Sequence, residues 1–210
     1  DMQVGIGGAL PGPVRATLRL RGGDRPTWQL RARADKVDTA LLAGADEPST
    51  TPLSLQLDAD GTGGTATVQG HVEQGDLRAV VRPSKLMLED KVLAFEPLVL
   101  EIFDGTVTAR GRGDFSEPEQ ATFRYAVTAR GLRFGGAPAD PVAGTEATPL
   151  IALDADLGLA GTTAAWAAVG NADVSRDGER AAVAFDGRGR DGGMVIRTLR
   201  ATTPTGTLDA

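Results

Sequence analysis

The segment from Leu98 to Phe134 reads LVLEIFDGTVTARGRGDFSEPEQATFRYAVTARGLRF and decides the fold. An apolar strand ends at Asp104-Gly105, a second strand follows, and a loop built on Pro118 precedes a third. In the third strand two sets of side chains alternate, an apolar set (Phe123, Tyr125, Val127, Ala129) and a polar set (Arg124, Thr128, Arg130). Strict alternation of this length is typical of an antiparallel sheet with one covered and one wetted face.

The composition sets limits on the fold class and on the partners. The chain has 210 residues, of which 28 are glycine, and only 4% are aromatic. Frequent glycine suits many strands joined by tight turns. The formal net charge of −6 opposes nucleic acid or an anionic bilayer surface as a partner, because both require a basic face. The absence of cysteine excludes disulfides and thiolate metal sites.

The domain organisation is expected to be simple. No stretch approaches the ~20 apolar residues of a membrane helix, so we expect no membrane-spanning segment in this chain. The first residues (DMQVGIGG) and the last (GTLDA) both read as pieces of strands. We therefore expect residues 1–210 to be one elongated β-repeat region cut from a longer chain. A break between sub-units is expected at residues 135–149, which show no periodic pattern.

Alternation elsewhere predicts roughly fourteen to sixteen short strands connected as a meander, without a long helix. The clearest hairpin joins Val14–Leu20 to Trp28–Ala34, and arginines on its polar side keep that side solvated. Strands of about five to seven residues would span about 17–23 Å. The period breaks at Asp35–Leu42, where one or two turns of helix are expected. Asp58–Gly61 is expected to be a turn.

A strand-turn-strand pattern recurs along the chain. Gly64–Gly70 (GTATVQG) matches Gly105–Gly111 (GTVTARG) at a spacing of 41 residues, and Gly206–Ala210 (GTLDA) resembles the start of a third copy. Repetition of such a unit favours a sheet that grows along one axis.

Candidate catalytic and metal-binding groups are few. The single histidine, His71, is expected on the solvated side of a strand, and no G-x-S-x-G nucleophile turn accompanies it. Asp58–Gly61 begins like a calcium loop but lacks the later acidic ligands. Gly187–Gly192 satisfies G-x-G-x-x-G, yet strand-like residues follow it, so we interpret it as a turn. We predict no catalytic, cofactor-binding or metal-binding residue and no enzymatic activity.

Two all-β folds share this alternation. One is an elongated, curled antiparallel sheet with an open hydrophobic groove, and the alternative is a closed β-sandwich in which a second sheet covers the apolar side. Small inward residues favour the open groove, because a closed core fills its volume. These small residues are Ala66, Gly70, Ala79, Ala109 and Ala129.

The repeated units resemble the translocation and assembly module (TamB) and AsmA-like family of bacterial envelope proteins. The resemblance lies in LSLQLDADGTGGTATVQGHV, LVLEIFDGTVTARGRGDF, IALDADLGLAGTTAAWAAVGNADV and LRATTPTGTLDA, and it covers most of the chain. It implies a taco-like β-sheet with an aliphatic groove that conducts phospholipid acyl chains between membranes. It also implies a periplasmic location in a Gram-negative bacterium, an inner-membrane anchor elsewhere in the parent protein, and a link to outer-membrane protein assembly.

The resemblance implies phospholipid acyl chains as the ligand, and an outer-membrane barrel assembly partner for other parts of the parent protein. The residues expected to line the groove are the inward apolar side chains Leu18, Leu30, Leu55, Leu57, Val68, Val81, Leu98, Leu100, Ile102, Val107, Phe115, Phe123, Tyr125, Val127, Leu153, Val183 and Phe185. The alternative function is a structural or protein-binding module of the cell envelope, which would offer a sheet edge to unfolded strands.

Overall fold

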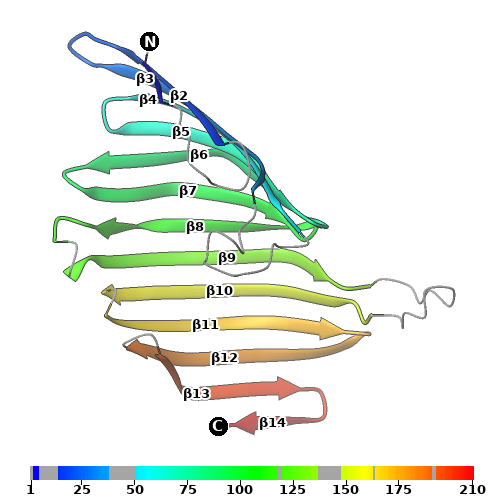
Figure 1. The fold of residues 1–210 in the computed structure, drawn as a ribbon. Coiled ribbons are helices and arrows are strands. Elements are labelled where there is room, and N and C mark those ends of the chain that lie inside the picture. Colours follow the sequence, from blue (N-terminus) through cyan, green and yellow to red (C-terminus); the bar gives the residue numbers. More distant parts are fainter. Residues whose placement is uncertain are drawn as a thin grey trace, which may run out of the picture. The chain divides into compact units, whose positions relative to one another are not determined.

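The computed structural model describes residues 2–4, 14–37, 51–117, 120–136, 148–162, 164–190 and 193–210, and these residues form strands and turns. The strands are β1 (Met2–Val4), β2 (Val14–Arg21), β3 (Thr27–Val37), β4 (Leu53–Thr62), β5 (Thr65–Gln74), β6 (Leu77–Glu89), β7 (Val92–Ile102), β8 (Gly105–Asp114), β9 (Thr122–Phe134), β10 (Ile151–Thr162), β11 (Ala165–Arg176), β12 (Glu179–Arg190), β13 (Gly193–Thr203) and β14 (Gly206–Asp209). Figure 1 labels these strands.

The chain divides into two compact units, one of Asp1–Glu89 with Phe95–Ile102 and one of Asp90–Ala94 with Phe103–Ala210. In the first unit consecutive strands pair with each other from β1 through to β6, always antiparallel. In the second unit β8 to β14 do the same. Of the predicted break at residues 135–149, residues 137–147 lie outside the described part of the chain, and the strands on either side of it, β9 and β10, pair directly.

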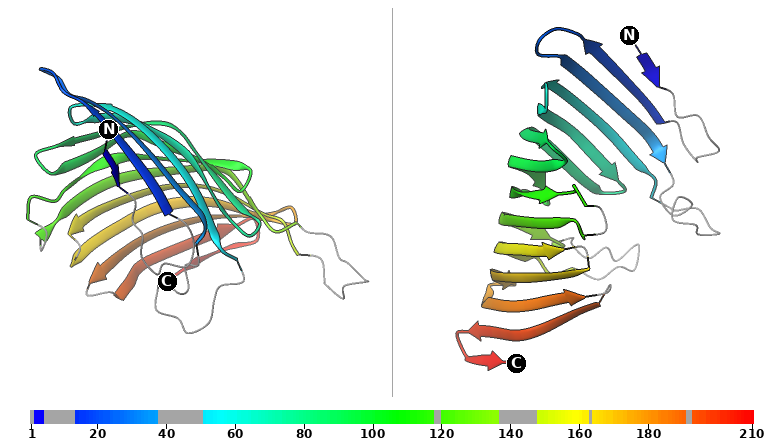
Figure 2. Two further views of the ribbon diagram at one scale, coloured as in Figure 1. Left: turned by 45° about the horizontal axis from the view of Figure 1, so that its top comes forward. Right: turned by 90° about the vertical axis from the view of Figure 1, so that its left-hand side faces the viewer.

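The open antiparallel sheet predicted from the sequence is confirmed in each unit. Figure 2 shows the second unit close to edge-on as a single layer, and its strands curve along their length. Within the described residues of each unit, all strands belong to one sheet whose order follows the chain. The closed sandwich, which needs two sheets face to face, is therefore not formed by these residues.

Most strands are longer than the sequence suggested, because polar segments continue the ladder. Both β6 and β9 have 13 residues. Asp58–Gly61 is not a turn but the end of β4, where Asp58 pairs with Arg31 of β3. Gly187–Arg190, also predicted as a turn, lies in β12; the two residues that follow are outside the described part of the chain.

The helix predicted at Asp35–Leu42 does not form in its described part. Asp35–Val37 ends strand β3, and the register with β4 shifts by one residue there. Lys36 has a φ of 48°, and its N–H donates to Ser54 Oγ over 3.2 Å. The break in the period is therefore a β-bulge, which inserts one extra residue into a strand. Residues 38–42 lie outside the described residues.

Tight turns open the repeated units. The repeat copies at Gly64 and Gly105 lie at the starts of β5 and β8, and the third copy is β14. The turn before β8 consists of Phe103 and Asp104, with φ of 50° and 60°, so Gly105 is already the first strand residue. Positive φ at both central residues is the geometry of the type I′ turn, whose twist matches that of the flanking strands.

Glycines in both units lie beneath indole rings of the neighbouring strand. Trp28 of β3 pairs with Gly61 of β4, and Trp166 of β11 pairs with Gly189 of β12. A Cβ added to either glycine would overlap the ring of its tryptophan. The Trp28 Nε1–H also donates to the carbonyl of Gly63 over 3.0 Å. Each glycine thus provides the space in which a flat ring covers the sheet.

We expect Gly189→Ala to lower the free energy of unfolding by roughly 1–3 kcal/mol, because the methyl group forces the indole ring out of its position. Urea denaturation followed by circular dichroism measures this change. The matched control is Gly22→Ala, since an added Cβ at Gly22 meets no atom within 4 Å.

A double-mutant cycle then identifies the ring as the cause. In a Trp166→Ala background, Gly189→Ala should cost much less, because the ring that it displaces is gone. An equal cost in both backgrounds would contradict this origin.

Candidate functional site

Cross-strand register gathers the apolar side chains of the first unit on one face of its sheet. Paired residues form rows that run across the strands. Two of these rows are Leu18–Leu30–Ala59–Val68 and Ala16–Ala32–Leu57–Gly70–Val81. The residues between these rows, such as Arg31 and Asp58, point to the opposite face because side chains alternate along a strand. We call the two sides the apolar face and the polar face of the first unit.

The second unit has the same division into an apolar face and a polar face. Its register also forms rows of apolar and small residues. Two of them are Val107–Ala129–Ala155–Ala172–Val183–Ala201–Leu208 and Ala109–Val127–Leu157–Gly170–Phe185–Leu199. Antiparallel pairing in chain order therefore keeps apolar residues opposite apolar residues from β8 to β14.

Most of the predicted lining residues lie on these two faces. In the first unit the apolar face holds Leu18, Leu30, Leu55, Leu57, Val68 and Val81. In the second unit it holds Val107, Phe123, Tyr125, Val127, Leu153, Val183 and Phe185. The structure thus brings together, within each unit, residues that the sequence grouped only by their alternation.

The remaining predicted lining residues are on β7 and after β8. Leu98, Leu100 and Ile102 share one side of β7, opposite Glu101, whose carboxylate lies 2.6 Å from Arg82 Nε at an exposed position. Phe115 follows the last residue of β8 and is 44% exposed. Its ring lies against Gly113, where an added Cβ would be 3.0 Å from Phe115 and 2.8 Å from the Tyr125 hydroxyl oxygen.

The apolar faces are only partly buried by the described residues. Val68, 7% exposed, is the one buried side chain among the predicted lining residues. The others are half-buried, apart from the exposed Phe115. The buried cluster in the first unit is small, consisting of Ala59, Ala66 and Val68 with Trp28, Leu30, Leu57 and Leu86 against it. Apolar area in each unit therefore remains accessible to a ligand.

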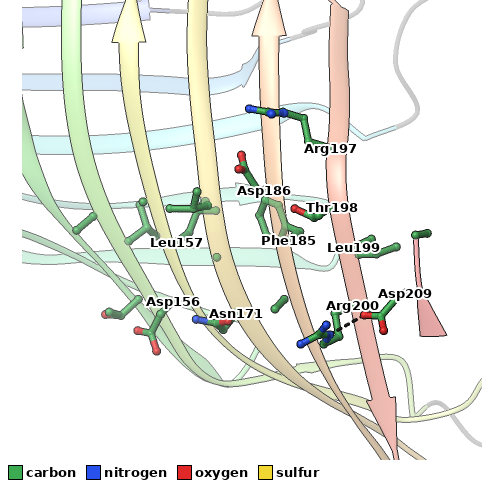
Figure 3. A pocket seen from close by; sticks show the side chains of 18 residues that line it. Asp156, Leu157, Asn171, Phe185, Asp186, Arg197, Thr198, Leu199, Arg200 and Asp209 are labelled. Atoms are coloured by element: carbon green, nitrogen blue, oxygen red, sulfur yellow. Dashed lines mark hydrogen bonds and ion pairs between the residues drawn. The ribbon is translucent and has the colours of Figure 1, made fainter. Parts of the chain in front are cut away.

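A hollow of about 1020 Å³ lies along β9 to β14 in the second unit. It follows the row that contains Val127, Leu157, Phe185 and Leu199. Figure 3 shows Leu157, Phe185 and Leu199 side by side across their strands, and the polar residues Asp156, Asp186 and Arg200 are their neighbours along the chain. Because side chains alternate along a strand, the apolar row and these polar neighbours belong to opposite faces of the sheet.

Charged side chains on the polar face behind this row are paired with each other. Arg200 Nε lies 2.6 Å from an Asp209 carboxylate oxygen, the dashed contact in Figure 3. Asp156 accepts two hydrogen bonds from the Arg130 guanidinium, over 2.7 and 2.8 Å. Paired charges offer less attraction to an ionic ligand, and the row on the other face of the sheet is apolar.

Tyr125 stands on the apolar face with its ring stacked on Phe123. Their ring centroids are 6.0 Å apart, with planes inclined by 17°. Burial raises the pKa of the Tyr125 hydroxyl above its ordinary value, because the charged phenolate is poorly solvated there. Tyr125 therefore reports how well water reaches this part of the face.

Several residues of the faces were missed as lining residues, among them Leu157, Leu199 and the two tryptophans. Trp28 and Trp166 lie on the apolar faces, each over a glycine of the next strand. Trp28 alternates in phase with Leu30 and Ala32, and that signal was present in the sequence. No signal in the sequence indicated that each ring lies over a glycine, because this pairing depends on cross-strand register.

Other kinds of site find little support in the described part of the chain. The residues there form no group of three or more His, Cys, Asp or Glu side chains placed to hold a metal ion. They include no helix with the length and apolar character needed to cross a bilayer. His71 pairs with Gln56 and so lies on the polar face of the first unit, as its strand position predicted.

No protein-family model, curated protein or solved structure matches the chain. The geometry itself presents two contrasting surfaces in each unit, one apolar and half-buried, the other rich in charge. An extended apolar surface of this kind binds ligands by excluding water from both partners, without directional contacts.

We expect the phenolate absorbance of the folded chain to titrate above pH ~10, the ordinary tyrosine value. The chain has a single tyrosine, so this absorbance reports Tyr125 alone. Since the folded pKa is raised, the associated stability is fully present below the unfolded pKa and is lost as the pH rises through the folded pKa. Urea denaturation at increasing pH should show this loss in the native chain and not in Tyr125→Phe.

The control for this prediction is the same titration in concentrated urea, where the midpoint should return to the ordinary value. Identical midpoints in the folded and unfolded chains would show that water reaches the hydroxyl freely.

Proposed function

We propose that the apolar faces bind phospholipid acyl chains, and that this chain is a segment of an inner-to-outer membrane bridge of the TamB and AsmA-like kind. The parent protein would be anchored in the inner membrane, cross the periplasm and contribute to outer-membrane assembly. The observation that carries this proposal is the continuity of the half-buried apolar rows across consecutive strands of each unit.

The energetics suit a ligand that moves. Each methylene that leaves water contributes about 0.8 kcal/mol, so a partly covered acyl chain is held by many small, equivalent contributions. Neighbouring strands are about 4.8 Å apart, so successive residues along a row offer similar contacts at short intervals. A ligand held in this way can shift along the face without breaking any single strong bond.

The division between the two faces suits an amphiphile. The acyl chains would cover residues such as Leu157 and Phe185, while the headgroup remains in water. The aromatic rings over Gly61 and Gly189 add flat apolar area at the surface of the sheet. The rival occupant is the apolar surface of another protein, which would use the same residues.

We expect photo-crosslinking amino acids at Leu100, Phe123 or Val127 to capture phospholipid from vesicles. The neighbouring positions Glu101, Arg124 and Thr128 are matched controls, since each adjoins a test position on the same strand and points to the opposite side. Capture of lipid only from the apolar side supports the proposal. Equal capture from both sides, or capture of protein alone, would overturn it.

A charge on the apolar face should also block binding. We expect Val127→Arg to weaken binding of a fluorescent phospholipid by about tenfold or more, because the guanidinium must lose water against the acyl chain. Thr128→Arg, one residue away on the polar face, should leave binding unchanged. Circular dichroism of both variants checks that the sheet is intact.

A further inference from the structure

The polar face of the first unit carries a row of residues that the lipid-binding proposal does not use. Cross-strand register places Arg15 opposite Arg33, Arg33 opposite Gln56, and Gln56 opposite His71. The four side chains come from β2, β3, β4 and β5 and share one face. They therefore form a line of hydrogen-bonding groups across four adjacent strands.

The pairing of Arg15 with Arg33 places like charges directly opposite each other. Like charges directly opposite each other on neighbouring strands are destabilising. The adjacent row shows the ordinary arrangement, with Arg31 opposite Asp58 and 3.5 Å between their charged atoms. In the described part of the chain neither Arg15 nor Arg33 has an ion pair or hydrogen bond from its guanidinium. Two positive charges thus face each other with no acid between them.

A hollow of about 450 Å³ lies at these residues. Its lining includes Arg15, Arg33, Gln56 and His71. The one carboxylate in the lining, Asp35, lies 3.5 Å from the Ser54 hydroxyl, which can donate to it. The positive charge of the two guanidinium groups therefore exceeds the negative charge of the lining.

We propose that this row, which we call the arginine row (Arg15, Arg33, Gln56 and His71), binds an anion of the phosphate class, either inorganic phosphate or a phosphate ester. A guanidinium group presents its N–H donors as a planar fork that matches two oxygens of a phosphate. Cross-strand neighbours have Cβ atoms about 5 Å apart, so the two forks can hold one tetrahedral anion between them. A carboxylate has only two oxygens and would occupy a single fork.

The remaining members of the row add donors beside the anion. His71 offers a ring N–H, and the Gln56 amide is held in place by its hydrogen bond to Asp58 over 3.3 Å. The chain as a whole has a net charge of −6, so the local excess of arginine on this face is what attracts the anion. The arginine row lies on the polar face, so anion binding does not depend on lipid binding by the apolar face.

The single histidine of the chain makes a direct experiment possible. We expect the one histidine cross-peak in an NMR spectrum of the ring protons to shift in a saturable way as inorganic phosphate is added at constant pH and ionic strength. A parallel titration with glycerol 3-phosphate separates a preference for the free anion from a preference for an ester. Chloride at matched ionic strength should leave the peak in place.

Substitutions then assign the site to the two arginines. Arg15→Gln and Arg33→Gln should each weaken the phosphate-induced shift by about tenfold or more, since each removes one charged fork. The matched control is Arg19→Gln on the same strand, where Arg19 faces Gln29 and not a second arginine. The control should bind phosphate as the native chain does.

Thermal unfolding gives a second readout that is specific to this arrangement. Without phosphate, Arg33→Gln should raise the melting temperature, because it relieves the repulsion between like charges. Added phosphate should raise the melting temperature of the native chain and leave that of the variant unchanged. No saturable shift of the His71 peak, or an equal shift in Arg15→Gln, Arg33→Gln and the native chain, would overturn the proposal.

Discussion

The structure depends on the register between consecutive antiparallel strands. Side chains alternate with a period of two, so a slip of one residue would turn the apolar side of a strand to the opposite face. In both units the pairing keeps apolar residues opposite apolar residues, from Leu18 and Leu30 in one unit to Phe185 and Leu199 in the other. Both the apolar faces and the arginine row follow from this alignment, because each is a set of residues at equivalent positions on neighbouring strands.

Tryptophan and glycine show how this register is used in packing. Trp28 and Trp166 each cover a glycine of the adjacent strand, where a methyl group would overlap the ring. The sequence favoured an open groove because small residues leave volume unfilled. The structure gives some of them another role: Ala66 and Ala129 are 7% and 8% exposed and belong to the buried part of the sheet. The accessible apolar area instead comes from half-buried aliphatic and aromatic side chains.

The sequence predicted the strands and their faces well, because alternation is a local property. It correctly placed Val127 on one side of its strand and Thr128 on the other. The local pattern gave a wrong prediction where a polar segment continues a strand. Asp58 was expected in a turn, but it lies in a strand and its partner Arg31 comes from a distant part of the chain. The direct opposition of Arg15 and Arg33 was equally hidden, since it requires the register of the hairpin as well as its existence. Burial and cross-strand neighbours are properties of pairing, and a single strand does not specify them.

The bulges have a consequence for how the strands tolerate changes in length. Register shifts occur between Ala34 and Val37, between Leu153 and Ala155, and at two other places, each with one strand longer by a residue. After each shift the apolar set continues on its original side, as Val37 does with 4% exposure. The bulge thus accommodates the extra residue, and the rest of the strand keeps its side chains on the same faces. Strands of this chain can therefore gain or lose one residue at a bulge during evolution without exchanging their two faces.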